Sequence, residues 1–139
     1  MPNPNRTQQN RNYGPAGGLP RGLTDEEIAK ILSGDGKTIA ETAHRLADEL
    51  VQLKSAQIRN FYGPLTKIRE SHEAAEAKLN RLHLMCPRLA YMEARERNAG
   101  PLRRDFESLI VKAEAQEKSL QGLFDFAEAV VGYHKQHQK

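Results

Sequence analysis

Histidine, cysteine and paired glutamates are the residues with which this chain could hold a metal ion or attack a substrate. The five histidines are His44, His72, His83, His134 and His137. Glu41 and His44 form one Glu-x-x-His step, whereas a carboxylate di-metal site in a helical bundle takes such a step from two helices plus two further glutamates. Cys86, the one cysteine, precedes a proline, and an isolated cysteine of this kind is usually a small buried residue. The sequence therefore predicts a protein that is not an enzyme and holds no metal or cofactor.

Arginine and lysine in the middle of the chain offer a different chemistry, the binding of phosphate groups. Residues 54–104 carry eleven basic and five acidic side chains, whereas residues 23–53 and 105–139 both have net negative charge. Eight of the eleven cations are arginines, whose planar and weakly hydrated guanidinium suits phosphate contacts. On charge alone, the candidate RNA-binding residues are Lys54, Lys67, Arg69, Arg88 and Arg97.

The spacing of Arg88 and Arg95, seven residues apart, predicts that they share one helix face with Tyr91 between them. Glutamates interleave with these cations, however, and a pair such as Glu93 and Arg97 is ordinary decoration of a solvated helix. Two classes of function stay open on this evidence. A nucleic-acid-binding protein would lose affinity steeply as salt increases, whereas a helical adaptor would join protein partners without nucleic-acid contact and nearly independently of salt.

Helices must position these side chains, because apolar residues recur at helical spacing from Leu23 onward and no strand-type alternation is present. Thr24 and Glu27 have the spacing of a capping box at the start of a short first helix. A second helix is expected to begin near Thr38. Asn98 to Pro101 marks a break, with one helix after it and a last helix bearing residues 120–134 on its apolar face. The sequence predicts an all-α bundle of about five to six helices.

The most regular apolar pattern runs from Ile58 to Leu82 in alternating steps of three and four residues, as in a heptad repeat. Pro64 lies inside this pattern, where a proline costs about 3 kcal/mol or more in a helix interior. Because the pattern keeps its phase across Pro64, we expect one long kinked helix rather than two. Pro87 is expected to end or bend this helix, with a further short helix over residues 87–97.

The first 22 residues differ from the rest of the chain. They contain four prolines and four glycines, no acidic residue, and Arg6, Arg11 and Arg21. The remaining body is formally neutral, so this segment accounts for the net charge of +3 of the 139-residue chain. We expect a disordered basic tail over residues 1–22, able to add loose electrostatic contact, followed by one helical domain over residues 23–139.

Several locations and classes of protein are excluded by composition. No apolar stretch is long enough for a transmembrane helix, and the beginning of the chain lacks the apolar region of a secretory signal. A lone cysteine forms no internal disulfide and gives no sign of an oxidising compartment. We therefore expect a cytoplasmic protein without membrane contact.

Three segments together resemble one known family. Residues 57–62 (QIRNFY) resemble the QIR-plus-aromatic motif of the small subunit of type III-A CRISPR–Cas (Csm) effector complexes. Residues 87–95 (PRLAYMEAR) resemble the proline, L-x-Y and downstream arginine of that family, and residues 124–135 (FDFAEAVVGYHK) resemble its C-terminal ending. Gly132 stands where that ending has alanine, a change worth about 1 kcal/mol of local stability in a helix.

The resemblance implies a non-catalytic helical subunit that stacks in several copies along the guide RNA–target RNA duplex of an antiviral defence complex. Its implied partners are guide RNA and target RNA through backbone contacts, copies of itself, and other Csm subunits including the backbone and large subunits, with no small-molecule substrate. By the same motifs, Arg59 and Arg95 are the strongest candidates for RNA binding. Four further motif residues suit core positions at their helical spacing: Tyr91, Phe124, Glu128 and Tyr133.

Overall fold

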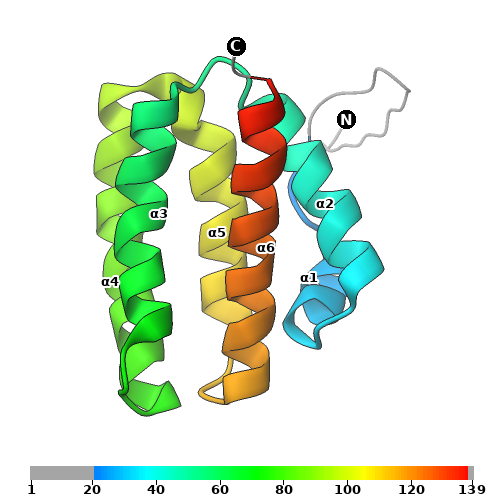
Figure 1. Cartoon of the computed structure of the whole chain (residues 1–139), viewed down its shortest axis with the longest axis vertical. Coiled ribbons are helices and arrows are strands. Elements are labelled where there is room, and N and C mark those ends of the chain that lie inside the picture. Colours follow the sequence, from blue (N-terminus) through cyan, green and yellow to red (C-terminus); the bar gives the residue numbers. More distant parts are fainter. Residues whose placement is uncertain (1–20, 138–139) are drawn as a thin grey trace, which may run out of the picture.

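The computed structural model describes residues 21–137 of the chain. This part contains six α-helices and one short 3-10 helix, joined by short loops (Figure 1). They are α1 (Asp25–Leu32), α2 (Gly36–Glu49), α3 (Ser55–Glu70), α4 (Ala75–Arg95), η2 (Arg97–Ala99), α5 (Gly100–Lys112) and α6 (Glu117–Gln136). No strand occurs between residues 21 and 137, which confirms the predicted all-α bundle. Within the same range, no helix combines the length and the apolar character needed to cross a bilayer.

Helix α6 lies at the centre of the bundle (Figure 1). It packs against α1 and α2 on one side and against α3 on the other, while α5 packs against α4. Helices α3 and α4 form an antiparallel pair at one edge of the molecule, and α1 and α2 form the opposite edge. The segment richest in cations, residues 54–104, therefore supplies one edge of the bundle rather than a stripe around it.

The first helix begins at the capping box that its sequence predicts. The Thr24 hydroxyl accepts a hydrogen bond from the Glu27 amide at 3.0 Å, and the Glu27 carboxylate accepts one from the Thr24 amide at 3.0 Å. After α1 the chain turns at Gly34, whose φ of +89° is a left-handed conformation that glycine adopts without steric cost. Asp35 then caps α2 through the Thr38 amide at 3.3 Å, so α2 begins two residues before the predicted start.

The prediction of one long helix over Ile58 to Leu82 is wrong, because the chain folds back at residues 71–74. Helix α3 continues through Pro64, as expected, but it ends at Glu70. Ser71 has an extended backbone, and its hydroxyl donates to the Ile68 carbonyl at 3.0 Å. Folding back turns both halves of the apolar pattern toward the same core, where most of its positions are buried or half-buried, whereas His72 at the fold-back is exposed.

Pro87 does not end the helix, and the separate helix predicted over residues 87–97 is wrong: α4 runs without interruption from Ala75 to Arg95. A proline leaves the carbonyl four residues before it without a helical partner. Here that residue is His83, and both His83 and Pro87 lie on the exposed side of α4, where water can hydrate the carbonyl.

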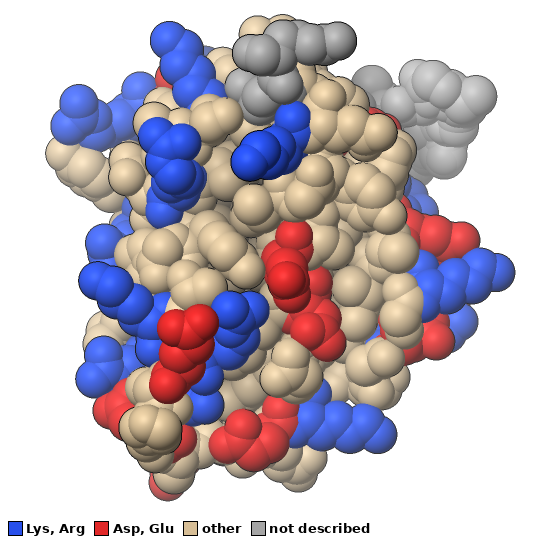
Figure 2. Space-filling model, viewed as in Figure 1, with Lys and Arg blue, Asp and Glu red and all other residues tan. Residues whose placement is uncertain are grey.

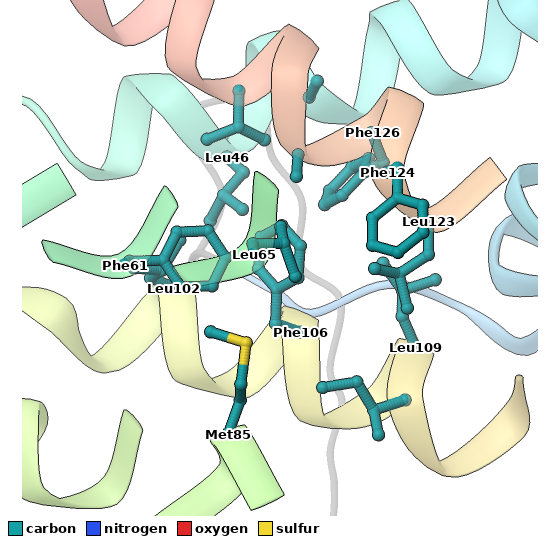
Figure 3. Close-up of a cluster of buried hydrophobic side chains, with 14 of the residues drawn as sticks. Leu46, Phe61, Leu65, Met85, Leu102, Phe106, Leu109, Leu123, Phe124 and Phe126 are labelled. Carbon is teal, nitrogen blue, oxygen red and sulfur yellow. The ribbon is translucent and has the colours of Figure 1, made fainter. Parts of the chain in front are cut away.

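Three phenylalanines join the helices at the middle of the bundle (Figure 3). Phe106 of α5 is fully buried, with its ring centroid 4.7 Å from that of Phe61 in α3 and 5.3 Å from that of Phe126 in α6. Leu65, Leu102 and Met85 surround them. Because Phe61 anchors α3 to this cluster, the outer face of α3 is held in place by the core behind it.

An ion-pair network fixes the start of the bundle against α2. Arg45 donates to both Glu27 carboxylate oxygens, at 2.8 and 3.0 Å, and Arg21 donates to one of them at 3.3 Å. Arg21 and Gly22 are the only described residues of the predicted basic tail, and residues 1–20 lie outside the described part. One of the three tail cations is thus already paired with the bundle.

Acid is expected to weaken this network at Glu27. Burial by itself would raise the pKa of Glu27, but the hydrogen bonds from Arg45 and the Thr24 amide and the charge of Arg45 lower it from 4.5 to about 2. The unfolded chain therefore takes up this proton more readily, so the stabilisation is complete above about pH 4.5 and is lost as the pH falls toward 2. Urea unfolding at pH 6, 4.5 and 3 should show a smaller acid loss for Glu27→Gln than for wild type. Equal losses in both proteins would contradict this assignment.

Candidate nucleic-acid interface

An open groove of about 850 Å³ runs between α3 and α4 on the outside of the bundle. Arg59 of α3 and Arg88, Tyr91 and Arg95 of α4 all line it. They meet because the two helices are antiparallel, which brings the first turns of α3 beside the last turns of α4 (Figure 1). We call this feature the α3–α4 groove. The two arginines carried by the family motifs, Arg59 and Arg95, therefore lie in one place although they are far apart in the sequence.

A second, smaller groove continues from the first along the same helix pair. Arg88 borders both grooves, and Lys67 of α3 and Arg81 of α4 line the second. Figure 2 shows Lys and Arg side chains gathered over the edge of the molecule that α3 and α4 form. On the α1–α2 side the same view shows basic and acidic side chains intermixed. The excess positive charge of the middle third is thus concentrated on one edge.

Ion pairing divides the basic residues of this segment into two groups. Among the described residues, six of the seven predicted RNA-binding cations have no ion-pair partner: Lys54, Arg59, Lys67, Arg88, Arg95 and Arg97. The other arginines of residues 54–104 are all paired, including Arg69 with Glu70 at 3.4 Å, Arg81 with Glu73 at 2.7 Å and Arg104 with Glu49 at 3.1 Å. Arg69 is therefore the weakest member of the predicted set.

Glu93 shows how the two groups arise. The i,i+4 spacing allows it to pair with Arg97, but its carboxylate instead accepts a hydrogen bond from Arg103 of α5 at 3.0 Å. Arg97 is left exposed in η2 without an ion pair among the described residues. Lys54, at the start of α3, and Arg97 line neither groove. They lie at the end of the helix pair where α3 begins and α4 stops (Figure 1).

Tyr91 does not lie in the core, which corrects the expectation from its helical spacing. Its side chain is 64% exposed, because Met85 and Leu89 take the buried positions of this part of α4. Arg95 donates a hydrogen bond to the Tyr91 hydroxyl at 3.1 Å, and its guanidinium carbon lies 5.7 Å from the ring centroid. This hydrogen bond raises the pKa of Arg95, so the guanidinium remains positively charged at physiological pH.

The other motif residues differ in burial. Phe124 is buried as expected, and Tyr133 is half-buried with its ring 4.6 Å from that of His44. Glu128 is exposed on α6 and not in the core. The groove also contains two polar side chains that charge-based reasoning missed, Gln57 and Asn60. Both belong to the QIRNFY segment, so that motif was the signal that could have found them.

Three of the five histidines contact other groups of the bundle, whereas His72 and His83 are exposed. His134 is buried, and its Nε2 lies 2.7 Å from the Leu53 carbonyl oxygen. His44 and His137 both contact the carboxylate of Asp48, at 3.5 and 3.0 Å. Burial raises the pKa of the Cys86 thiol, which disfavours the reactive thiolate. Within residues 21–137, no group of three or more histidine, cysteine, aspartate or glutamate side chains is arranged to hold a metal ion.

Comparison with known proteins identifies a family. The family model described as Csm2 Type III-A matches residues 33–139, which include helices α2 to α6. No curated protein and no solved structure matches the chain at a significant level. The matched range contains every residue that lines the α3–α4 groove, and it leaves out residues 1–32.

Proposed function

This chain belongs to the Csm2 family, the small subunit of type III-A CRISPR (Csm) complexes, and from that premise we propose that it binds RNA without catalysing a reaction. The α3–α4 groove and the cations beside it are the proposed RNA-binding surface. The observation that carries the proposal is the gathering of cations without ion-pair partners on this edge, among the described residues, while the remaining arginines of the same segment are neutralised.

Such a surface suits the RNA backbone better than base sequence. Guanidinium and ammonium groups are matched to phosphate oxygens, and these contacts carry no sequence information. In an RNA-guided complex, base pairing supplies the sequence specificity, and the protein recognises the backbone and the A-form shape. We propose that several copies stack along the guide RNA–target RNA duplex, each contacting the backbone through this edge and its neighbours through other surfaces, in the cytoplasm.

The test is RNA binding by Csm complexes assembled with wild-type or variant small subunits, measured by fluorescence anisotropy at two salt concentrations. For every phosphate that a variant no longer neutralises, the slope of log affinity against log salt should become shallower by about 0.7–0.9. Arg59→Ala and Arg95→Ala should each show this change together with weaker binding, about threefold to tenfold at low salt.

Arg103→Ala is the matched control, because Arg103 belongs to the same segment but pairs with Glu93 and Glu107 and lines neither groove. Its salt slope should lie much closer to that of wild type than the slope of Arg59→Ala does. If the assembled wild-type complex shows no salt dependence, or if Arg103→Ala changes the slope as much as Arg59→Ala does, the proposed RNA surface is wrong.

The alternative is a helical adaptor that assembles with proteins alone. One structural observation weighs against its simplest form: most of the apolar pattern from Ile58 to Leu82, which would join a partner, is buried or half-buried inside this chain. The two functions are separated by purifying the complex from its native host and extracting nucleic acid. Short RNAs in the purified complex favour the proposed function, and a complex free of RNA favours the adaptor.

A further inference from the structure

We propose that the α3–α4 groove holds an unpaired nucleobase, stacked on the ring of Tyr91. This inference rests on the proposed function and extends it, since it assigns the groove a nucleotide rather than phosphates alone. The starting observation is Tyr91 itself. The large apolar or aromatic side chains that are exposed within residues 21–137 are Val51, Leu84, Tyr91 and Val111, and Tyr91 is the aromatic one.

The Tyr91 ring has a side-chain partner, Arg95, one turn further along α4. Its hydroxyl accepts the hydrogen bond from Arg95, and the guanidinium also lies within cation–π distance of the ring. An aromatic side chain that is ordered before binding loses little conformational entropy when a ligand stacks on it. Tyr91 and Arg95 together therefore form a stacking surface that is open to solvent, since Tyr91 is 64% exposed.

The groove around Tyr91 has the mixed lining that a nucleotide requires. Pro64 and Met92, both half-buried, contribute apolar surface on which a base can lie. Asn60 contributes a carboxamide that can both donate and accept hydrogen bonds, and Gln57 contributes an amide donor while its oxygen accepts from the Lys54 amide at 3.1 Å. Arg59 and Arg88 contribute positive charge for the adjoining phosphate. A surface that bound phosphates alone would need only the last of these three components.

Charge favours an anionic occupant over a protein helix. Three arginines without ion-pair partners among the described residues line the groove, and Glu96 is the one acidic residue among its lining. The Glu96 carboxylate is already engaged with the backbone amide of Asn98 at 3.3 Å. The base must be unpaired, because bases within an A-form duplex are covered on both faces by their neighbours, whereas a base splayed out of the stack is free to contact an aromatic side chain.

The test is photo-crosslinking within the assembled complex. Guide and target RNAs carrying one 5-iodouridine each, moved one position at a time, are irradiated, and the crosslinked peptides of the small subunit are identified by mass spectrometry. We expect crosslinks to Tyr91 from a subset of positions. Tyr91→Phe should keep them, because the ring remains. Tyr91→Ala should weaken RNA binding about tenfold without changing the salt slope, because a base stack is removed but no charge.

Val111→Ala serves as the control for removing an exposed apolar side chain outside the groove, and it should bind RNA like wild type. The inference is overturned if no position crosslinks to Tyr91, or if Tyr91→Ala binds RNA as tightly as wild type while Arg59→Ala still lowers the salt slope. If Arg59→Ala still lowers the salt slope, the proposed RNA surface is unaffected by either result. Loss of a protein subunit from Tyr91→Ala complexes with unchanged RNA binding would also overturn it, in favour of a protein partner. Absence of salt-dependent RNA binding in wild type would overturn both proposals.

Discussion

Gly122→Ala is expected to destabilise the bundle by about 2–3 kcal/mol, the upper part of the usual range for overpacking. A Cβ atom on Gly122 in α6 would lie 2.1 Å from the carbonyl oxygen of Ile31, near the end of α1. That oxygen belongs to the backbone, so the clash cannot be relieved by turning a side chain. Either α1 must move away from α6 or the two helices must separate locally.

Gly132→Ala is the matched control in the same helix. A Cβ atom on Gly132 would meet no atom within 4 Å, and the residue is exposed. Alanine there should stabilise the protein by up to about 1 kcal/mol, because glycine is the poorer helix former. Urea unfolding followed by circular dichroism measures both variants. Similar midpoints for the two would mean that α1 and α6 do not approach as closely as described.

Phe106→Ala is expected to cost about 3–5 kcal/mol, as is usual for removing a fully buried aromatic ring. Its side chain has no exposed surface and contacts Phe61 and Phe126 from two other helices. The resulting cavity would lie directly behind the part of α3 that lines the α3–α4 groove (Figure 3). Such a loss consumes much of the 5–15 kcal/mol that typically stabilises a domain.

Phe106→Leu distinguishes reduced volume from a general intolerance of the site, because leucine refills most of the cavity. We expect it to retain well over half of the stability that Phe106→Ala loses, measured by the same urea unfolding. Val111→Ala, at an exposed position of the same helix, should change the stability by less than about 0.5 kcal/mol. A Phe106→Ala protein that unfolds at the wild-type urea concentration would contradict the central role of the three phenylalanines.

The sequence predicts local structure well where the signal is itself local. Thr24 and Glu27 form the capping box that their spacing indicates, and Pro101 lies in the first turn of α5 as expected. The heptad pattern predicted helix and buried face correctly for α3, but it failed at Ser71. Periodicity cannot distinguish a helix that continues from one that folds back onto the same core, because both keep the apolar residues in phase.

The candidate site was predictable in its residues but not in its arrangement. Arg59 and Arg95 follow from the motifs, yet only the antiparallel pairing of α3 and α4 brings them to one groove. Which cations keep their charge uncompensated depends on contacts between helices, such as that of Arg104 with Glu49, 55 residues apart in the sequence. No local pattern encodes such a pair. The exposure of Tyr91 was missed for the same reason, because helical spacing alone does not say which side of α4 meets solvent.

The fold-back at residues 71–74 has a consequence for how the subunit responds to its ligand. The α3–α4 groove draws its lining from both arms of a hairpin, so it does not exist in a chain whose hairpin is open. If the proposed function is correct, an RNA strand bound to Arg59 and Arg95 at once would hold the two arms together, and its binding free energy would add to the stability of the folded chain. At a free RNA concentration one hundred times Kd this linkage amounts to about 2.7 kcal/mol. Occupied subunits in a complex would then resist heat and proteolysis better than the same chain alone, and RNA would act as a structural member of the assembly.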